Sequence, residues 1–168
     1  MTEPMQEEFW GDSMWIDFYL NVKGVNFDKW TSVFRFTNDR DKNRDEYGNR
    51  CPGVFVHPEK VYIGNAVNGE VSHDLYIRPE IDFLVDVPMH ISISQNKVAN
   101  GSVIYQVKMD GKSKDGWTMV NTQPVTKFMN PKLMLSDKHY DSFGPEGTLR
   151  ELRFMKNKIS KFISKSDF

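Results

Sequence analysis

Apolar and polar residues alternate with a period of two along most of this chain. In the stretch 13–24 the alternation separates two sets of side chains: Met14, Ile16, Phe18, Leu20 and Val22 on one face, and Trp15, Asp17, Tyr19 and Asn21 on the other. A period of two is typical of a strand with one buried face. Stretches of this kind, rich in Val, Ile, Phe and Tyr, are predicted as strands at 13–24, 30–38, 53–58, 60–67, 82–87, 90–95, 103–111, 117–123, 131–137 and 148–156.

Residues that favour turns separate these stretches. Gly, Pro, Asn and Asp fill the gaps, and Asn100–Gly101, Asp110–Gly111 and Asp115–Gly116 are dipeptides typical of hairpin turns. Many short strands at this spacing predict an all-β fold, a two-sheet antiparallel sandwich or a barrel. Neither an internal repeat nor a Pro- or Ser-rich linker interrupts the pattern, so we expect one domain.

Two segments depart from the alternation. Residues 38–50 are almost entirely polar and charged, which predicts an exposed loop between strands. Near the C-terminus, Ile159, Phe162 and Ile163 stand at helical spacing among lysines, which predicts a short amphipathic helix. We therefore divide the chain into a β-sandwich domain, residues 1–156, and a basic C-terminal tail, residues 157–168.

Charge and cysteine content narrow the function classes. The formal net charge of the 168 residues is −1, which argues against nucleic acid and against an anionic membrane as partner. The apolar stretches are too short to span a bilayer, and the N-terminus lacks the apolar core of a signal peptide. We expect a cytoplasmic protein, or an extracellular one whose signal was removed.

The lone Cys51 excludes an intrachain disulfide and a thiolate metal cluster, and we expect it to be buried.

Several phrases of the sequence resemble a known superfamily. They are WIDFYLNVKG, GNRCPGVFVHPEKVYIGNAVNG, MHISISQNKVANGSVIYQVKMDGK and the closing FMNPKLMLSD and TLRELRFMK. Their order over residues 12–156 resembles the concanavalin A-like, laminin G-like jelly rolls of the lectin–glucanase superfamily. The resemblance implies a two-sheet antiparallel jelly-roll sandwich. It leaves function open, because the superfamily contains lectins, adhesion modules, pentraxin-like proteins and glycosidases.

Two acids test the glycosidase alternative. Retaining glycosidases need two carboxyl groups about 5 Å apart, and the resemblance implies that glucanases of this fold supply them from a Glu-x-Asp-x-(x)-Glu strand. Glu80 and Asp82 match the first two places, but Leu84 and Val85 occupy the third. The alternation Ile81, Phe83, Val85, Val87 predicts an ordinary half-buried strand instead. We therefore predict that the protein is not an enzyme.

The polar loop offers a possible calcium site. Its oxygen-bearing residues at alternate positions are Asp39, Asp41, Asn43 and Asp45, and calcium loops place hard oxygen ligands in this way. Arg44 and Arg50 replace the glycine and the glutamate of an EF-hand. The alternative is a charge-balanced loop in solvent, so calcium is a candidate cofactor only.

The leading hypothesis is lectin-like binding of a glycan or glycoprotein. Sugars stack on aromatic rings and hydrogen-bond to planar polar groups. The candidate ligand-binding residues at strand ends and in loops are Trp30, Arg35, Asn38, Tyr47, Arg50, Asn65, Trp117, His139 and Tyr140. One alternative is an extracellular protein–protein or structural assembly module. Another is a carrier in which some of the nine Met and twelve Phe residues line an apolar pocket between the sheets.

Overall fold

The computed structural model of the chain describes residues 2–3, 13–24, 29–37, 50–57, 60–64, 80–109, 117–121, 131–137, 144–156 and 159–167. These residues form strands β1 (Thr2–Glu3), β2 (Ser13–Gly24), β3 (Thr31–Thr37), β4 (Gly53–Val56), β5 (Lys60–Gly64), β6 (Glu80–Asp82), β7 (Met89–Lys97), β8 (Val103–Met109), β9 (Trp117–Asn121), β10 (Lys132–Leu135), β11 (Glu146–Lys156) and β12 (Ile159–Asp167). In this part of the chain no helix is long and apolar enough to cross a membrane.

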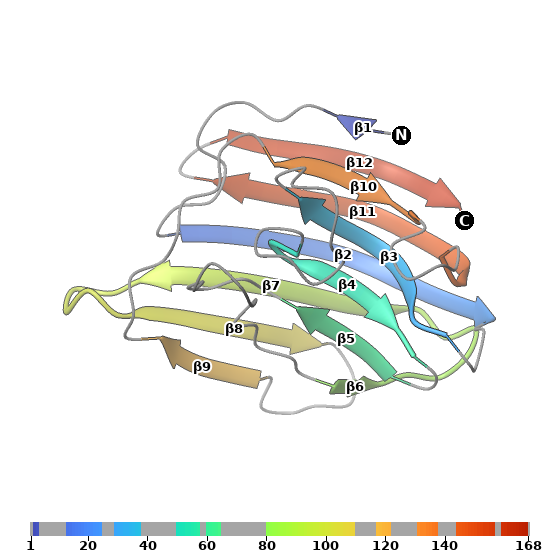
Figure 1. The fold of residues 1–168 in the computed structure, drawn as a ribbon, viewed down its shortest axis with the longest axis horizontal. Coiled ribbons are helices and arrows are strands. Elements are labelled where there is room, and N and C mark those ends of the chain that lie inside the picture. The colour runs from blue at the N-terminus through green and yellow to red at the C-terminus, as the bar shows by residue number, and fades with distance from the viewer. Residues whose placement is uncertain are drawn as a thin grey trace.

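The strands pair antiparallel in two layers (Figure 1). The first sheet has the order β1-β10-β3-β4-β5-β6, and the second sheet has the order β12-β11-β2-β7-β8-β9. Strands close in sequence often lie in different layers: β2 belongs to the second sheet and β3 to the first. The predicted two-sheet antiparallel sandwich is confirmed.

The hydrophobic pattern located most strands correctly. The stretch 13–24 forms β2, and its side chains alternate between buried and accessible positions along almost its whole length. The Asn100–Gly101 dipeptide lies in the turn between β7 and β8, where Gly101 has a φ of 86° that favours glycine. The Gly101 N–H donates to the Val98 carbonyl at 2.9 Å and closes the turn.

The predicted strand at 82–87 is wrong. β6 ends at Asp82, and Leu84, Val85 and Val87 are 52%, 55% and 48% exposed. The Asp86 N–H donates to the carbonyl of Val22 at 2.7 Å, so the chain leaves the first sheet here and crosses to the end of β2. The alternation of residue types does not reveal this change of layer. Val85 and Val87, which the alternation predicted to be on the buried face of a strand, are exposed to solvent in the structure.

The predicted terminal helix is also wrong. Residues 159–167 form β12, which pairs with β11 from Thr148↔Asp167 to Lys156↔Ile159. A sheet edge offers a row of backbone donors and acceptors. Pairing with the edge of β11 favours a strand here, whereas only three apolar residues at helical spacing favour a helix. The segment assigned to a basic tail therefore extends the second sheet.

The core lies between the sheets and is rich in aromatic rings. Phe18 of β2 contacts Phe34 of β3 edge to face, with ring centroids 5.0 Å apart, and Phe36 of β3 contacts Phe154 of β11 at 5.3 Å. Edge-to-face geometry matches the positive ring edge to the negative ring face. These contacts join the two sheets. Cys51 is buried, as expected.

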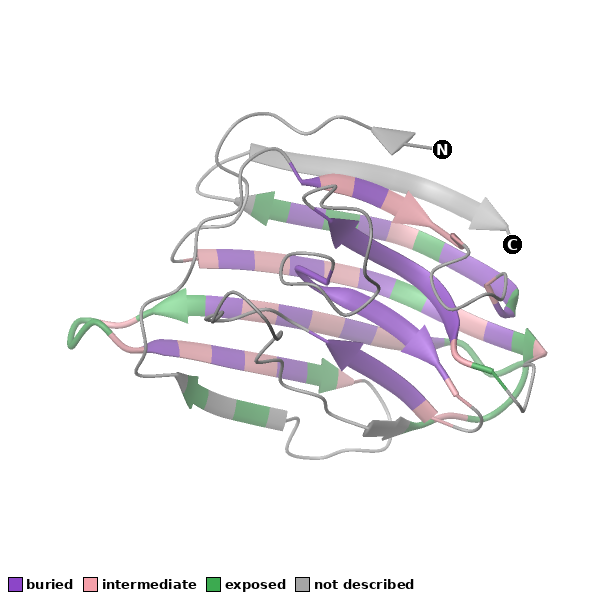
Figure 2. Cartoon of the chain, viewed as in Figure 1, coloured by how far each residue is buried: buried purple, intermediate pink, exposed green. Residues whose placement is uncertain are grey.

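Burial differs between the sheets (Figure 2). Strands β3 and β4 are buried at every position, and β5 at every position after Lys60, so in these strands both faces of the first sheet are covered. Strands β2, β7 and β8 instead alternate, with one face in the core and one accessible. The outer face of the second sheet is therefore accessible over β2, β7 and β8.

Candidate functional site

The outer face of the second sheet carries polar and aromatic side chains from neighbouring strands. Because alternate residues of β2 face the core, the remaining ones face outward: Trp15, Asp17, Tyr19 and Asn21. Register brings Asp17 beside Ser92 and Tyr19 beside His90 of β7, and Tyr19 beside Arg150 of β11. Four strands thus contribute to one surface, since β8 adds Gln106 and Lys108.

Tyr19 is the exposed ring of this surface. Its side chain is 40% exposed. The ring stacks on the imidazole of His90, with centroids 4.7 Å apart and ring planes 29° apart. His90 is held in turn by Asp17, whose Oδ1 lies 2.5 Å from His90 Nε2. The Asp17 carboxylate and the His90 ring therefore fix the orientation of an aromatic ring that remains open to solvent.

Asn21 provides an unmatched hydrogen-bonding group next to Tyr19. Its Nδ2 donates to Asp86 Oδ1 at 3.2 Å, but its Oδ1 is buried and accepts no hydrogen bond from any described residue. Most buried polar atoms in proteins have a partner, because leaving one without a partner costs about 1–3 kcal/mol. The Asn21 oxygen is thus a buried acceptor without a described donor, on a residue that lines the hollow described below.

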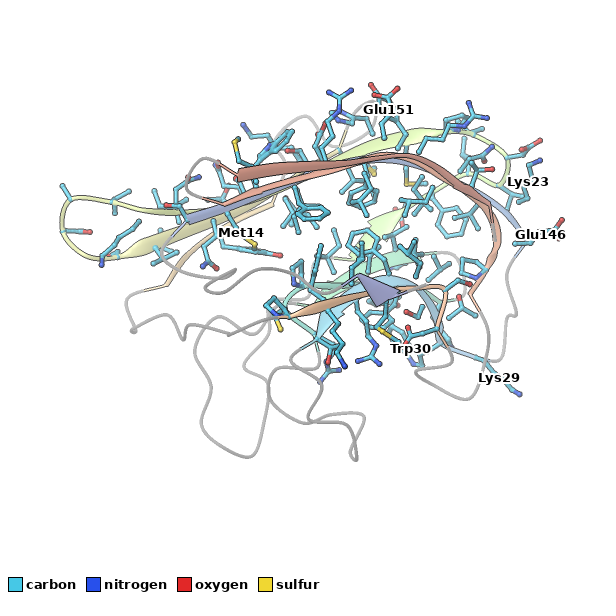
Figure 3. The ribbon with its side chains drawn as sticks, turned by 90° about the horizontal axis from the view of Figure 1, so that it is seen from above. Met14, Lys23, Lys29, Trp30, Glu146 and Glu151 are labelled. Atoms are coloured by element: carbon cyan, nitrogen blue, oxygen red, sulfur yellow. The ribbon has the colours of Figure 1, made fainter. Side chains whose placement is uncertain are left out.

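A bulge in β11 shapes the other side of the surface. The register between β11 and β2 shifts between Arg150 and Arg153, and Glu151 has a φ of 52°. One extra residue in β11 changes the direction of successive side chains, so Arg150, Glu151 and Arg153 all reach the surface. Arg153 Nη2 donates to Glu151 Oε2 at 2.5 Å. In Figure 3 Glu151 extends away from the outer face of the second sheet.

These side chains surround a hollow of about 190 Å³. Its lining residues are Tyr19, Leu20, Asn21, Pro88, Thr148, Arg150 and Glu151. The hollow thus combines an aromatic ring, an amide, a hydroxyl group, a guanidinium and a carboxylate. This set can stack on the C–H face of a sugar ring and hydrogen-bond to its hydroxyl groups.

The structure places the predicted ligand residues elsewhere. Trp30 is partly buried and stacks on His57 with centroids 4.8 Å apart, and it contacts Tyr62 at 4.4 Å. Trp30 lies on the side of the sandwich opposite to Glu151 (Figure 3). Arg35 and Arg50 are both buried, on or next to the first sheet. Trp117 begins β9 at the position opposite Val107, which is a buried residue of the core.

Arg35 has an internal partner. Its Nε donates to Asp137 Oδ2 at 2.7 Å, and Asp137 Oδ1 accepts a second hydrogen bond from Ser32 Oγ at 2.8 Å. The register Arg35↔Gly53 brings it close to Arg50, whose Cγ lies 3.3 Å from the place a Gly53 Cβ would occupy. Arg35 and Arg50 thus both lie next to Gly53, and Arg35 holds the segment after β10.

The remaining predicted residues lie outside the described part of the chain. They are the ligand candidates Asn38, Tyr47, Asn65, His139 and Tyr140, and the calcium candidates Asp39, Asp41, Asn43 and Asp45. Within the described residues, no group of three or more His, Cys, Asp or Glu side chains could hold a metal ion.

The hollow was missed by sequence reasoning, although one signal for it was present. The alternation in 13–24 placed Trp15, Asp17, Tyr19 and Asn21 on one face, and two aromatic rings next to an acid and an amide on a solvent-facing strand are unusual. His90 and Arg150 lie 71 and 131 positions away from Tyr19 in the sequence. Only strand pairing brings them to it.

Comparison with known proteins supports the fold. No protein-family model matches the chain, and no curated protein matches it. Among solved structures, a native heptameric SAP-like pentraxin from Limulus polyphemus is 13% identical, with a TM-score of 0.55 over 91% of this chain and 68% of that one. The fold is a concanavalin A-like jelly roll.

Two other solved structures are similar at lower scores. The marine PL-14 alginate lyase from Aplysia kurodai is 12% identical, with a TM-score of 0.47 over 94% of this chain and 70% of that one. The carbohydrate recognition domain of Emp47p is 10% identical, with a TM-score of 0.43 over 79% of this chain and 67% of that one.

Proposed function

We propose that this jelly roll is a non-catalytic, lectin-like module that binds a glycan in the hollow on the outer face of its second sheet. The observation that carries the proposal is the arrangement of Tyr19 and Asn21. A half-exposed ring, fixed by His90, stands beside a buried acceptor without a donor. A pyranose would cover the ring with its C–H face, and its hydroxyl groups would contact the polar side chains that line the hollow, Thr148 and Arg150 among them.

The geometry of the acids favours binding over hydrolysis. Glu80 and Asp82 lie in β6 at the edge of the first sheet, opposite Tyr62 and Lys60. The strand ends at Asp82, and the place of a third carboxylate falls on Leu84, an exposed residue of the following turn. The described strand therefore lacks the third carboxylate that the glucanase pattern requires.

A protein-binding module is the second candidate, because Leu84, Val85 and Val87 expose apolar side chains on one short turn. Clustered exposed apolar residues often mark contact surfaces between proteins. A carrier function has no comparable support: in the described core, Phe18, Phe34, Phe36 and Phe154 form a chain of edge contacts between the sheets.

A glycan array with the complete chain tests the proposal. We expect retention of one class of glycan by the wild-type protein and at least tenfold weaker binding by Tyr19→Ala, about 1.4 kcal/mol. Met155→Ala is the matched control, because Met155 is similarly exposed on the same sheet. Absence of binding across the array would overturn the glycan proposal. For the second candidate we take a second copy of this chain as the partner. Sedimentation of a Leu84→Ser, Val85→Ser, Val87→Ser variant should then show weaker self-association than in the wild type.

A further inference from the structure

The charged groups around the hollow differ in whether they already have partners. Asp17 pairs with His90, Glu151 pairs with Arg153, and Asp86 accepts a hydrogen bond from Asn21. Arg150 lines the hollow, is exposed, and makes no hydrogen bond or ion pair with the other described residues. The Asn21 amide is neutral and leaves the charge of Asp86 uncompensated, but Asp86 does not line the hollow. Among the lining residues Arg150 is therefore the charged group without a described partner.

The position of Arg150 suits a ligand that rests on Tyr19. Arg150 and Tyr19 are direct neighbours across the β11–β2 pair, so their side chains leave the sheet side by side. On the other side of Arg150, Lys165 of β12 is the register partner. Lys165, Arg150, Tyr19 and His90 thus occupy one row across four strands. Neighbouring strands lie about 4.8 Å apart, so the row has the length of a short oligosaccharide.

We infer that the glycan bound in this hollow is anionic and carries a carboxylate or a sulfate ester that Arg150 binds. This inference rests on the proposed glycan function and specifies its ligand class. A guanidinium presents parallel N–H donors that match the two oxygens of a carboxylate or sulfate, and such pairs are strong and directional. Tyr19 then stacks on the sugar ring while Arg150 holds its acidic substituent.

The acids near the hollow do not oppose this inference. Glu151 also lines the hollow, but the guanidinium of Arg153 neutralises its carboxylate at 2.5 Å. Asp17 is covered by His90, and its side chain is only 13% exposed. Asp86, next to Asn21, keeps its negative charge but does not line the hollow. Within the hollow an incoming anion therefore meets Arg150 and a Glu151 carboxylate that Arg153 already pairs.

Calorimetric titration of the complete chain with polygalacturonate, dextran sulfate and neutral dextran tests the inference. We expect one or both anionic polymers to bind and neutral dextran to bind at least tenfold more weakly. Arg150→Gln should weaken anionic binding at least tenfold, and Arg150→Lys should restore part of it. Lys108→Gln is the matched control, since it removes one exposed positive charge from the same sheet outside the hollow, and we expect less than a twofold effect.

The outcomes separate this inference from the proposed function. Binding of polygalacturonate alone would identify a carboxylate, and binding of dextran sulfate alone would identify a sulfate ester. Equal losses in Arg150→Gln and Lys108→Gln would overturn the inference, because they would show attraction by general charge. Binding to neutral dextran that depends on Tyr19 and not on Arg150 would overturn it while preserving the glycan function. If neither anionic polymer binds, the inference is wrong, and the glycan array decides the proposed function separately.

Discussion

Arg35 in β3 donates through its Nε to Oδ2 of Asp137, two residues after the end of β10, over 2.7 Å. Both side chains are largely removed from solvent, with exposed fractions of 7% and 13%. The ion pair thus joins β3 to the segment that leaves its neighbouring strand. The arginine that the sequence suggested as a sugar ligand has a structural role.

Replacing Asp137 should therefore lower stability. Asp137→Asn removes the negative charge that compensates the buried Arg35 guanidinium and weakens the hydrogen bond from Ser32. We expect a loss of about 2–4 kcal/mol in the free energy of unfolding, measured by urea denaturation. Asp82→Asn, at an exposed acid, is the control and should change stability by less than about 0.5 kcal/mol. Equal stabilities of the two variants would contradict the structural role of the pair.

Gly147 is required by a close backbone approach. A Cβ at this position would lie 2.2 Å from the carbonyl oxygen of Asn21, beside the register shift at the start of β11. Gly147→Ala should cost about 2–3 kcal/mol, because backbone atoms have to move. It should also weaken glycan binding, since the Asn21 carbonyl belongs to a residue of the hollow.

Gly101→Ala serves as the comparison. Its Cβ would meet no atom within 4 Å, and only the φ of 86° opposes the substitution. We expect a smaller cost of about 1 kcal/mol and unchanged glycan binding. Thermal unfolding of both variants measures the difference. A larger loss in Gly101→Ala than in Gly147→Ala would contradict the close approach at Asn21.

His90 should influence binding through the orientation of Tyr19. His90→Ala removes the ring on which Tyr19 stacks. A stacked aromatic pair is worth about 0.5–1.5 kcal/mol, which corresponds to roughly a two- to twelvefold loss of glycan affinity. His90→Phe retains an aromatic ring and should recover most of the affinity. If His90→Phe binds as weakly as His90→Ala, the hydrogen bond between His90 and Asp17 matters more than the stacking.

Tyr105 should make the fold sensitive to alkaline pH. The side chain is buried in the core, and this burial raises the pKa of the Tyr105 phenol above its ordinary value of 10.0. The folded state therefore keeps the proton where the unfolded chain loses it, so stability is fully present below pH 10 and declines as the pH rises further. One such ionisation lowers the free energy of unfolding by about 1.4 kcal/mol for each pH unit above 10.

Tyr105→Phe removes this contribution. We expect a shallower decline of the unfolding free energy between about pH 10 and 11.5, measured by urea denaturation at each pH. Tyr19→Phe, which removes a half-exposed phenol from the outer face of the same sheet, is the control. An unchanged slope in Tyr105→Phe would show that other groups dominate alkaline unfolding.

By itself the sequence determined the all-β class, the positions of most strands and the inward face of β2. These features depend on local periodicity, which can be read from the residues of one strand alone. The turn at Asn100–Gly101 followed from local chemistry in the same way. Where pairing with a distant strand decided the outcome, as in β12 and after Asp82, local periodicity gave the wrong element.

Which polar residues form a site depended on how distant strands pair. Arg35 resembled a surface ligand in the sequence, but Asp137, 102 positions later, occupies it. Tyr19 became part of a site because β7 and β11 pair on either side of β2 and bring His90 and Arg150 to it. Strand pairing between distant segments is set by the packing of the whole sandwich, and no single stretch of the chain contains that information.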